Sequence, residues 1–248
     1  MASSTAVETG GAATPLKSVL HRVQQAAERS GRNVEEIRVV AASKTKSISA
    51  LRQVYDAGHR CFGENYVKEL LQKAPQLPDD IEWHLIGNLQ SNKVKPLIAG
   101  VPNLAYVESV DDEKIANLLD LAVEKVGRKP LKVFVQVNTS GETSKFGVEP
   151  AQCVDLVKHI TNCPNLEFCG LMTIGMLDYT STPENFKVTI KHSGHQTLSN
   201  CRSEVCKALG IPETQCELSM GMTADFEQAI KMGSTTVRIG TAIFGPRE

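Results

Sequence analysis

The sequence predicts an α/β protein folded as a single (β/α)8 barrel of the TIM type, with one extra helix at the N-terminus. Short apolar segments alternate with amphipathic helical patterns along most of the chain, which indicates parallel strands joined by crossover helices. There are eight such segments, the number that closes a barrel, and 248 residues is a length typical of that fold. An open, doubly wound sheet remains the alternative, because the alternation alone fits both architectures.

The N-terminal part divides into a tail and a helix. Residues 1–14 are mostly small, carry only one charge (Glu8) and lack an apolar core, so we expect a disordered tail and no secretory signal. From Pro15 to about Ser30 the apolar residues follow helical spacing, and Gly31 is a typical helix end. This segment is the extra helix.

The remaining elements follow in strict alternation. The predicted strands are 37–43, 60–64, 82–87, 104–109, 131–138, 167–174, 216–220 and 236–243. The predicted helices are 47–57, 65–74, 89–99, 111–126, 150–161, part of 184–209, and 224–232. No linker or change in composition marks a second domain, so residues 15–248 are expected to form one.

Composition excludes several classes of function. The formal net charge of −1 gives no footprint for nucleic acid or an anionic membrane, and no apolar run reaches the roughly 20 residues of a membrane span. The seven cysteines are odd in number and include no CxxC pair. They favour reduced, buried thiols in a cytoplasmic protein over a disulfide framework or a zinc site.

Polar residues collect where the predicted strands end, which is the face that carries the active site in such barrels. Lys44 follows the first strand, and Asn65 follows the second. A lysine at this place could simply extend into solvent. His84, Asn138 and Thr173 lie near the same rim, and a lone histidine such as His84 is more often structural than catalytic.

The seventh and eighth strands end in small and hydroxyl residues, where barrels commonly bind phosphate. Ser219 begins the turn Ser-Met-Gly-Met-Thr, and the eighth strand runs Val-Arg-Ile-Gly-Thr over 237–241, so that Gly240 and Thr241 again place a glycine and a hydroxyl together. Taken alone, either feature is more simply explained as an ordinary Gly/Ser turn that binds no ligand. Arg238 interrupts an apolar strand and shares its inner face with Gly240, so it needs an acceptor such as a ligand atom.

A lysine, a phosphate cradle and an inward arginine together indicate a phosphorylated aldehyde. A lysine desolvated in a barrel mouth can lose its proton and form a Schiff base with such a ligand. Pyridoxal 5′-phosphate (PLP) has all the required groups. A purely structural module would leave Lys44, Arg238 and both turns unexplained.

Seven motifs resemble one family. VAASKTK, FGENYVKE, WHLIGNLQSNK, VNTSGETSKFGV, GLMTIG, ELSMGMTADFEQAI and GSTTVRIGTAIFG, spread over residues 37–245, together resemble the pyridoxal phosphate homeostasis proteins of the YggS/PROSC type. The resemblance implies a barrel similar to the N-terminal domain of alanine racemase. It also implies a Schiff base on Lys44, Asn65 near the cofactor, the phosphate near Ser219, Gly240 and Thr241, and Arg238 facing the pyridine nitrogen.

The implied role is intracellular homeostasis of PLP (vitamin B6), with possible delivery to apo-enzymes, and not catalysis. An arginine keeps the pyridine nitrogen unprotonated, which weakens the ring as an electron sink, but racemases of this kind also place an arginine there, so Arg238 alone does not exclude one. A PLP-dependent amino-acid racemase is the alternative. Racemases of this kind take a second base from a C-terminal β-domain, which we do not expect in a chain ending three residues after the last barrel motif. We expect a monomer.

One segment departs from the family pattern. Residues 187–196 separate two helical stretches with β-branched residues and Gly194, which are poor helix formers. We interpret them as an insertion of about ten residues that forms an exposed loop. His192 and His195 within it could suggest a metal pair, but two histidines without further ligands favour the loop.

Overall fold

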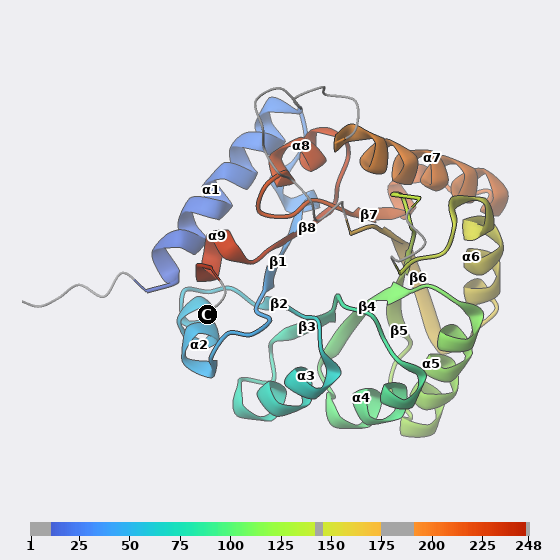
Figure 1. Ribbon diagram of the computed structural model, residues 1–248, viewed down its shortest axis with the longest axis horizontal. Helices are drawn as coiled ribbons and strands as arrows, with labels where there is room; N and C mark the ends of the chain where they lie inside the picture. The colour runs from blue at the N-terminus through green and yellow to red at the C-terminus, as the bar shows by residue number, and fades with distance from the viewer. Residues whose placement is uncertain (1–10, 142–145, 175–190, 247–248) are drawn as a thin grey trace, which may run out of the picture.

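The structure is a computed structural model that describes residues 11–141, 146–174 and 191–246, with no side chain described for 191–193. Eight parallel strands form a closed barrel in the order β1 to β8, with β8 pairing back onto β1. Helices surround the barrel, as Figure 1 shows from one end. The predicted fold is therefore confirmed, and the open sheet is excluded because β1 and β8 are hydrogen-bonded neighbours.

The elements alternate as expected. The strands are β1 Arg38–Ala42, β2 Cys61–Glu64, β3 Glu82–Leu85, β4 Leu104–Val110, β5 Leu131–Gln136, β6 Leu166–Met172, β7 Glu217–Ser219 and β8 Thr236–Ile239. The helices are α1 Ala13–Arg29, α2 Ile48–Asp56, α3 Val67–Lys73, α4 Val94–Gly100, α5 Glu113–Val126, α6 Cys153–Thr161, α7 Lys191–Leu209, α8 Phe226–Lys231 and α9 Thr241–Phe244. None of these helices combines the length and apolar composition that a membrane crossing needs.

The apolar core lies between the barrel and its helices. Trp83 on β3 is fully buried and contacts Phe62 on β2, with ring centroids 5.9 Å apart. Because side chains alternate along a strand, the residue after Trp83 points the other way, into the barrel. That residue is His84, which is also fully buried. The barrel interior is thus polar at several levels, and this polarity positions the candidate site.

Among the element boundaries that differ from the predictions are the start of α1 and the end of β8. Helix α1 begins at Ala13, so Ala13 and Thr14 belong to the helix and not to the predicted tail. Strand β8 ends at Ile239, and of the predicted strand 236–243 the residues 241–243 belong to helix α9. The chain turns at Gly240, whose carbonyl accepts hydrogen bonds from the amides of Ile243 and Phe244 at 2.9 Å each.

The prediction of an exposed loop at 187–196 is wrong for residues 191–196, the part of it that the structure describes. Helix α7 begins at Lys191, while residues 187–190 lie outside the described residues. Leu198, Cys201 and Val205 are buried along one face of α7, and packing of that face outweighs the poor helix propensity of Gly194. His195 is not exposed, and its Nε2 lies 3.6 Å from Asp225 Oδ2.

Candidate functional site

Lys44 lies where the ends of three neighbouring strands meet. It follows β1, which pairs with β2 on one side and with β8 on the other. The amide of Ser43 donates to the Gly63 carbonyl of β2 at 2.9 Å. On the other side Gly240 is so close to β1 that an added Cβ would lie 3.1 Å from the Ala42 carbonyl oxygen. Lys44 itself is half-buried.

A buried lysine holds the backbone on either side of Lys44. Lys73 at the end of α3 is 6% exposed, and its Nζ donates to the Ser43 carbonyl at 2.9 Å. The same ammonium contacts Glu64 Oε1 at 2.7 Å and Glu69 Oε1 at 2.6 Å. Glu69 Oε1 also accepts from the Thr45 amide at 2.7 Å. We call Lys73, Glu64 and Glu69 the Lys73 cluster.

The Lys73 cluster holds an unfavourable backbone conformation. Thr45 has φ of 64°, in the left-handed region that costs a residue with a Cβ about 1–2 kcal/mol. Its bond to Glu69 offsets that cost. Burial raises the pKa of Glu64, although hydrogen bonds from Lys73 and Ser43 partly oppose the rise. The cluster therefore fixes the direction in which the chain leaves β1, and with it the origin of the Lys44 side chain.

Arg238 lies inside the barrel, as predicted, but the protein itself supplies acceptors. Its NH1 donates to Ser219 Oγ at 2.5 Å and its NH2 to the Thr173 carbonyl at 2.6 Å. Ser219 Oγ donates in turn to Glu108 Oε2 at 2.5 Å, and Glu108 Oε1 lies 2.6 Å from Nδ1 of His84. All of these side chains are at most 4% exposed. We call His84, Glu108, Ser219 and Arg238 the Arg238 network.

Charge compensation keeps the Arg238 network ionised. Burial alone would raise the pKa of Glu108, but the hydrogen bond and charge of His84, the charge of Arg238 and the hydrogen bond from Ser219 hold it below the ordinary value. Burial lowers the pKa of Arg238, and Glu108 opposes this. An arginine still keeps its proton at any physiological pH. The barrel therefore presents a fixed positive charge between β7 and β8.

The turns after β7 and β8 lie against each other. Gly221 has φ of 96°, and a Cβ there would lie 2.5 Å from the Cβ of Ala229, so only glycine fits. Its carbonyl accepts from the Arg238 amide at 3.0 Å. Two residues later, Thr223 Oγ1 accepts from the Ala242 amide at 3.5 Å. The two turns thus bring the Thr223 hydroxyl to the start of α9, beside Gly240 and Thr241.

Asn65 offers a polar atom without a protein partner. Its Oδ1 is buried and accepts no hydrogen bond among the residues that the structure describes. Buried polar atoms are normally paired, so an unpaired one beside Lys44 fits a site that expects a ligand. The other lysine near β1, Lys46, instead donates from Nζ to the Pro246 carbonyl at 2.5 Å.

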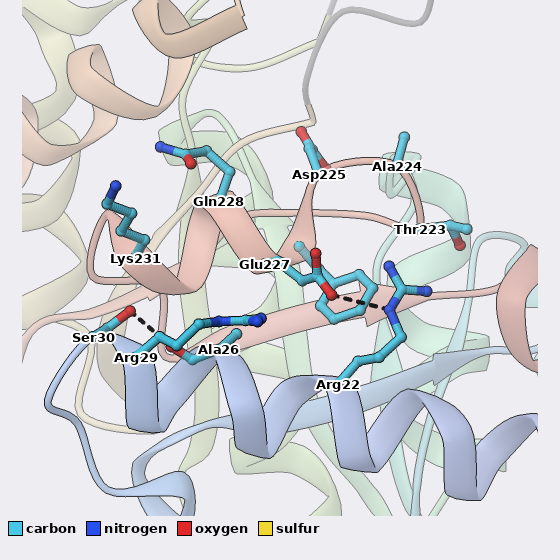
Figure 2. Close-up of a pocket in the computed structure, with 11 residues that line it drawn as sticks. Arg22, Ala26, Arg29, Ser30, Thr223, Ala224, Asp225, Glu227, Gln228 and Lys231 are labelled. Carbon is cyan, nitrogen blue, oxygen red and sulfur yellow. Dashed lines mark hydrogen bonds and ion pairs between the residues drawn. The ribbon is translucent and has the colours of Figure 1, made fainter.

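A pocket of about 370 Å³ lies elsewhere, between α1 and α8 on the outside of the barrel (Figure 2). Arg22, Arg29 and Lys231 line it together with Glu227, which pairs with Arg22 at 3.0 Å. None of the six predicted site residues lines this pocket. The chemistry described above therefore does not depend on it, although Thr223 borders both places.

The comparisons with known proteins agree with this geometry. The family described as "Alanine racemase, N-terminal domain" matches residues 15–248. A pyridoxal phosphate homeostasis protein from Bos taurus is 48% identical over 244 residues, covering 94% of this chain and 86% of that protein. The human protein of the same name is 46% identical, covering 96% of this chain and 87% of that protein. The chain belongs to the pyridoxal phosphate homeostasis protein family.

Solved structures show the same barrel. PipY from Synechococcus elongatus has been solved with PLP bound. It superposes on this chain with a TM-score of 0.74 at 29% identity, and the match covers 94% of this chain and 100% of PipY. An alanine racemase from Clostridium difficile has a TM-score of 0.68 at 13% identity, covering 93% of this chain and 56% of the racemase. That second likeness concerns the fold alone.

The structure brings the predicted site residues to one end of the barrel, at adjoining strands. Lys44, Asn65, Gly240 and Thr241 lie at the ends of β1, β2 and β8, while Ser219 and Arg238 lie deeper and bond each other. Ser219 as a phosphate ligand stays a prediction, since its hydroxyl donates to Glu108 and accepts from Arg238. Sequence reasoning missed Thr223, Glu108 and Lys73. Glu108 gave a signal, because it interrupts the apolar strand 104–109 as Arg238 interrupts its own.

Proposed function

We propose that this protein binds PLP through a Schiff base on Lys44 and serves in homeostasis of the cofactor inside the cell. The observation that carries the proposal is the arrangement around Lys44. A half-buried amine stands on a backbone fixed by the Lys73 cluster, next to the narrow turn at Gly240. The name shared by relatives at 46–48% identity and the PLP-bound PipY structure support the same ligand.

Each group of the cofactor has a counterpart among the residues. PLP when bound would supply an aldehyde, with which the Lys44 amine would condense with loss of water. Gly240, Thr241 and the Thr223 hydroxyl would hold the phosphate with backbone and hydroxyl donors, together with Ser219 as predicted. The unpaired Asn65 Oδ1 would accept a hydrogen bond from the ring hydroxyl. Arg238, held by Ser219 and Thr173, would keep its proton opposite the pyridine nitrogen.

We propose that the protein carries PLP and does not use it for catalysis. Relatives at 46–48% identity bear the name of homeostasis proteins, whereas the alanine racemase likeness is at 13% identity. Holding the aldehyde would limit its reactions with stray amines and thiols. We further propose a cytoplasmic monomer that can pass PLP to apo-enzymes.

The test is cofactor uptake by the full chain. We expect one PLP per chain and a visible absorbance band, lost in Lys44→Ala and kept in the matched control Lys46→Ala. Uptake that is unchanged in Lys44→Ala would contradict the role of Lys44. A wild-type protein that takes up no PLP would contradict the proposed function itself. Amino-acid racemisation by the loaded protein would favour the racemase alternative.

A further inference from the structure

Three metal-ligating side chains meet at the end of the barrel opposite Lys44. Cys61 and Glu82 are paired at the first positions of β2 and β3, and His84 lies two residues further along β3. The cysteine sulfur, a carboxylate oxygen and a ring nitrogen of these three residues all lie within 4.8 Å of one another. Cys61 Sγ donates to Glu82 Oε2 at 3.2 Å. Glu82 is exposed and Cys61 is partly exposed, so solvent ions can reach them.

One of the two ring nitrogens of His84 is available to a metal, and the other is bonded to Glu108. Its Nδ1 is bonded to Glu108 Oε1 at 2.6 Å, and its ring stacks on Tyr106 with centroids 4.4 Å apart. These contacts fix both the position and the plane of the imidazole. Its Nε2 is fully buried and has no hydrogen-bond partner among the described residues. Metal-ligating histidines typically show this arrangement, with the second nitrogen held by a carboxylate.

We propose that Cys61, Glu82 and His84 form a binding site for a zinc-type divalent cation, with Glu108 orienting the histidine. Sulfur, imidazole nitrogen and carboxylate oxygen are the ligands that zinc takes, whereas calcium and magnesium prefer oxygen alone. A thiolate and a carboxylate neutralise the charge of the ion. On binding, the Cys61 thiol proton and any proton on His84 Nε2 leave to solvent, and water takes the fourth position.

The neighbouring cation does not compete for the carboxylate. Arg38, at the first position of β1, is paired with Glu217 at 2.7 Å and lies over the Tyr106 ring. Glu82 is therefore left to Cys61 and the ion. The sequence alone could not indicate this site, because 61, 82 and 84 show no zinc spacing and His84 Nε2 becomes available only through the fold. The site does not depend on the proposed binding of PLP.

The experiment is a titration of the chelator-treated full chain with Zn²⁺ by calorimetry, and with Co²⁺ by visible absorption. We expect one ion per chain and the d–d bands of tetrahedral Co²⁺ with a thiolate ligand. Cys61→Ser and Glu82→Gln should each weaken binding by at least the 10- to 100-fold typical of outer-shell changes, as an order-of-magnitude lower bound. Cys163→Ser, which removes a buried thiol at the end of α6, is the matched control and should bind as the wild type does.

Two results would overturn the site. One is a wild-type protein whose Co²⁺ spectrum lacks tetrahedral bands, a measurement that stands even if a variant fails to fold. The other is equal affinity in Cys61→Ser, Glu82→Gln and the wild type, which would assign bound metal to other groups. PLP uptake measured in parallel should be unchanged in Cys61→Ser and Glu82→Gln, because neither residue lies at the Lys44 end of the barrel.

Discussion

The Lys73 cluster and the Arg238 network are both buried groups of charges, yet they hold different things. The Lys73 cluster bonds backbone atoms, namely the Ser43 carbonyl and the Thr45 amide. In the Arg238 network the group that is held is a side chain, the guanidinium of Arg238. The Lys73 cluster therefore fixes the backbone from which the Lys44 side chain extends. The Arg238 network fixes the position of the guanidinium charge. The backbone at Lys44 is held through its neighbours Ser43 and Thr45, whereas Arg238 is held through its own side chain.

The two groups also differ in charge balance. Lys73 carries one positive charge against two carboxylates, and burial raises the pKa of Glu64. Arg238 faces the single carboxylate of Glu108, whose pKa is lowered despite burial, through the hydrogen bond and charge of His84, the charge of Arg238 and the bond from Ser219. The Lys73 cluster thus depends strongly on its one cation, whereas the Arg238 network shares its interactions among more partners.

Removal of the Lys73 ammonium should have the largest effect. Lys73→Met leaves the buried Glu64 and the partly exposed Glu69 without their cation, and breaking a buried pair costs about 3–5 kcal/mol of unfolding free energy. Urea denaturation measures it, and Lys68→Met, on the exposed side of the same helix, is the control with almost no loss. The variant should also retain PLP less well. Equal stability of the two variants would show that the cluster does not hold this part of the chain.

Replacement of Arg238 by lysine should cost less. Arg238→Lys keeps a positive charge near Glu108 but loses the planar fork that reaches both Ser219 and Thr173. We expect a loss of about 1.5–3 kcal/mol in unfolding free energy, the range for hydrogen bonds of charged groups. The absorbance band of bound PLP should shift because its ring nitrogen loses a fixed partner. A loss larger than that of Lys73→Met would reverse the order of the comparison.

The pH dependence should be the smallest effect and should have opposite signs in the two groups. Glu108 has a lowered pKa, so its stabilisation is present above the ordinary value of 4.5 and is lost as the pH falls through its folded pKa. Glu64 has a raised pKa, so its ionisation opposes folding as the pH rises above 4.5. Relative to wild type, Glu108→Gln should therefore lose least at acid pH, and Glu64→Gln should lose most there.

Unfolding free energies of both variants at a series of pH values decide this point. Parallel curves for Glu108→Gln and Glu64→Gln would mean that the two carboxyls share one environment, against the contrast drawn from their partners. Both substitutions keep the size of the side chain, so packing differences contribute little, although glutamine replaces one acceptor oxygen by a donor NH2 group.

Sequence patterns predicted the barrel and one end of the site because both depend on local periodicity. Lys44 and Asn65 stand at strand ends, which apolar runs mark clearly, whereas Gly240 and Thr241 lie within the predicted strand 236–243 and only the structure places them after β8. Lys73 was missed because a lysine four residues after Glu69 is typical of an exposed helical ion pair. Its burial arises only when α3 packs against the end of β1.

Other features depend on contacts across the barrel. Glu108 on β4 meets Ser219 on β7, 111 residues later, and no spacing rule encodes that meeting. The helical start of α7 was mispredicted for a similar reason, since burial of Leu198 and Val205 outweighs the local preference around Gly194. Thr223 gains its place from the turn at Gly221, whose conformation follows from close packing on α8.

Reduction of the PLP-loaded full chain with borohydride, followed by mass mapping of the labelled peptide, tests the central proposal most directly. Reduction converts a Schiff base into a stable secondary amine on the lysine that formed it. We predict one label per chain, on Lys44, with none on Lys46, which bonds Pro246, or on Lys73, which is buried among carboxylates. A label on another lysine, or a loaded protein that takes up no label, would contradict the account.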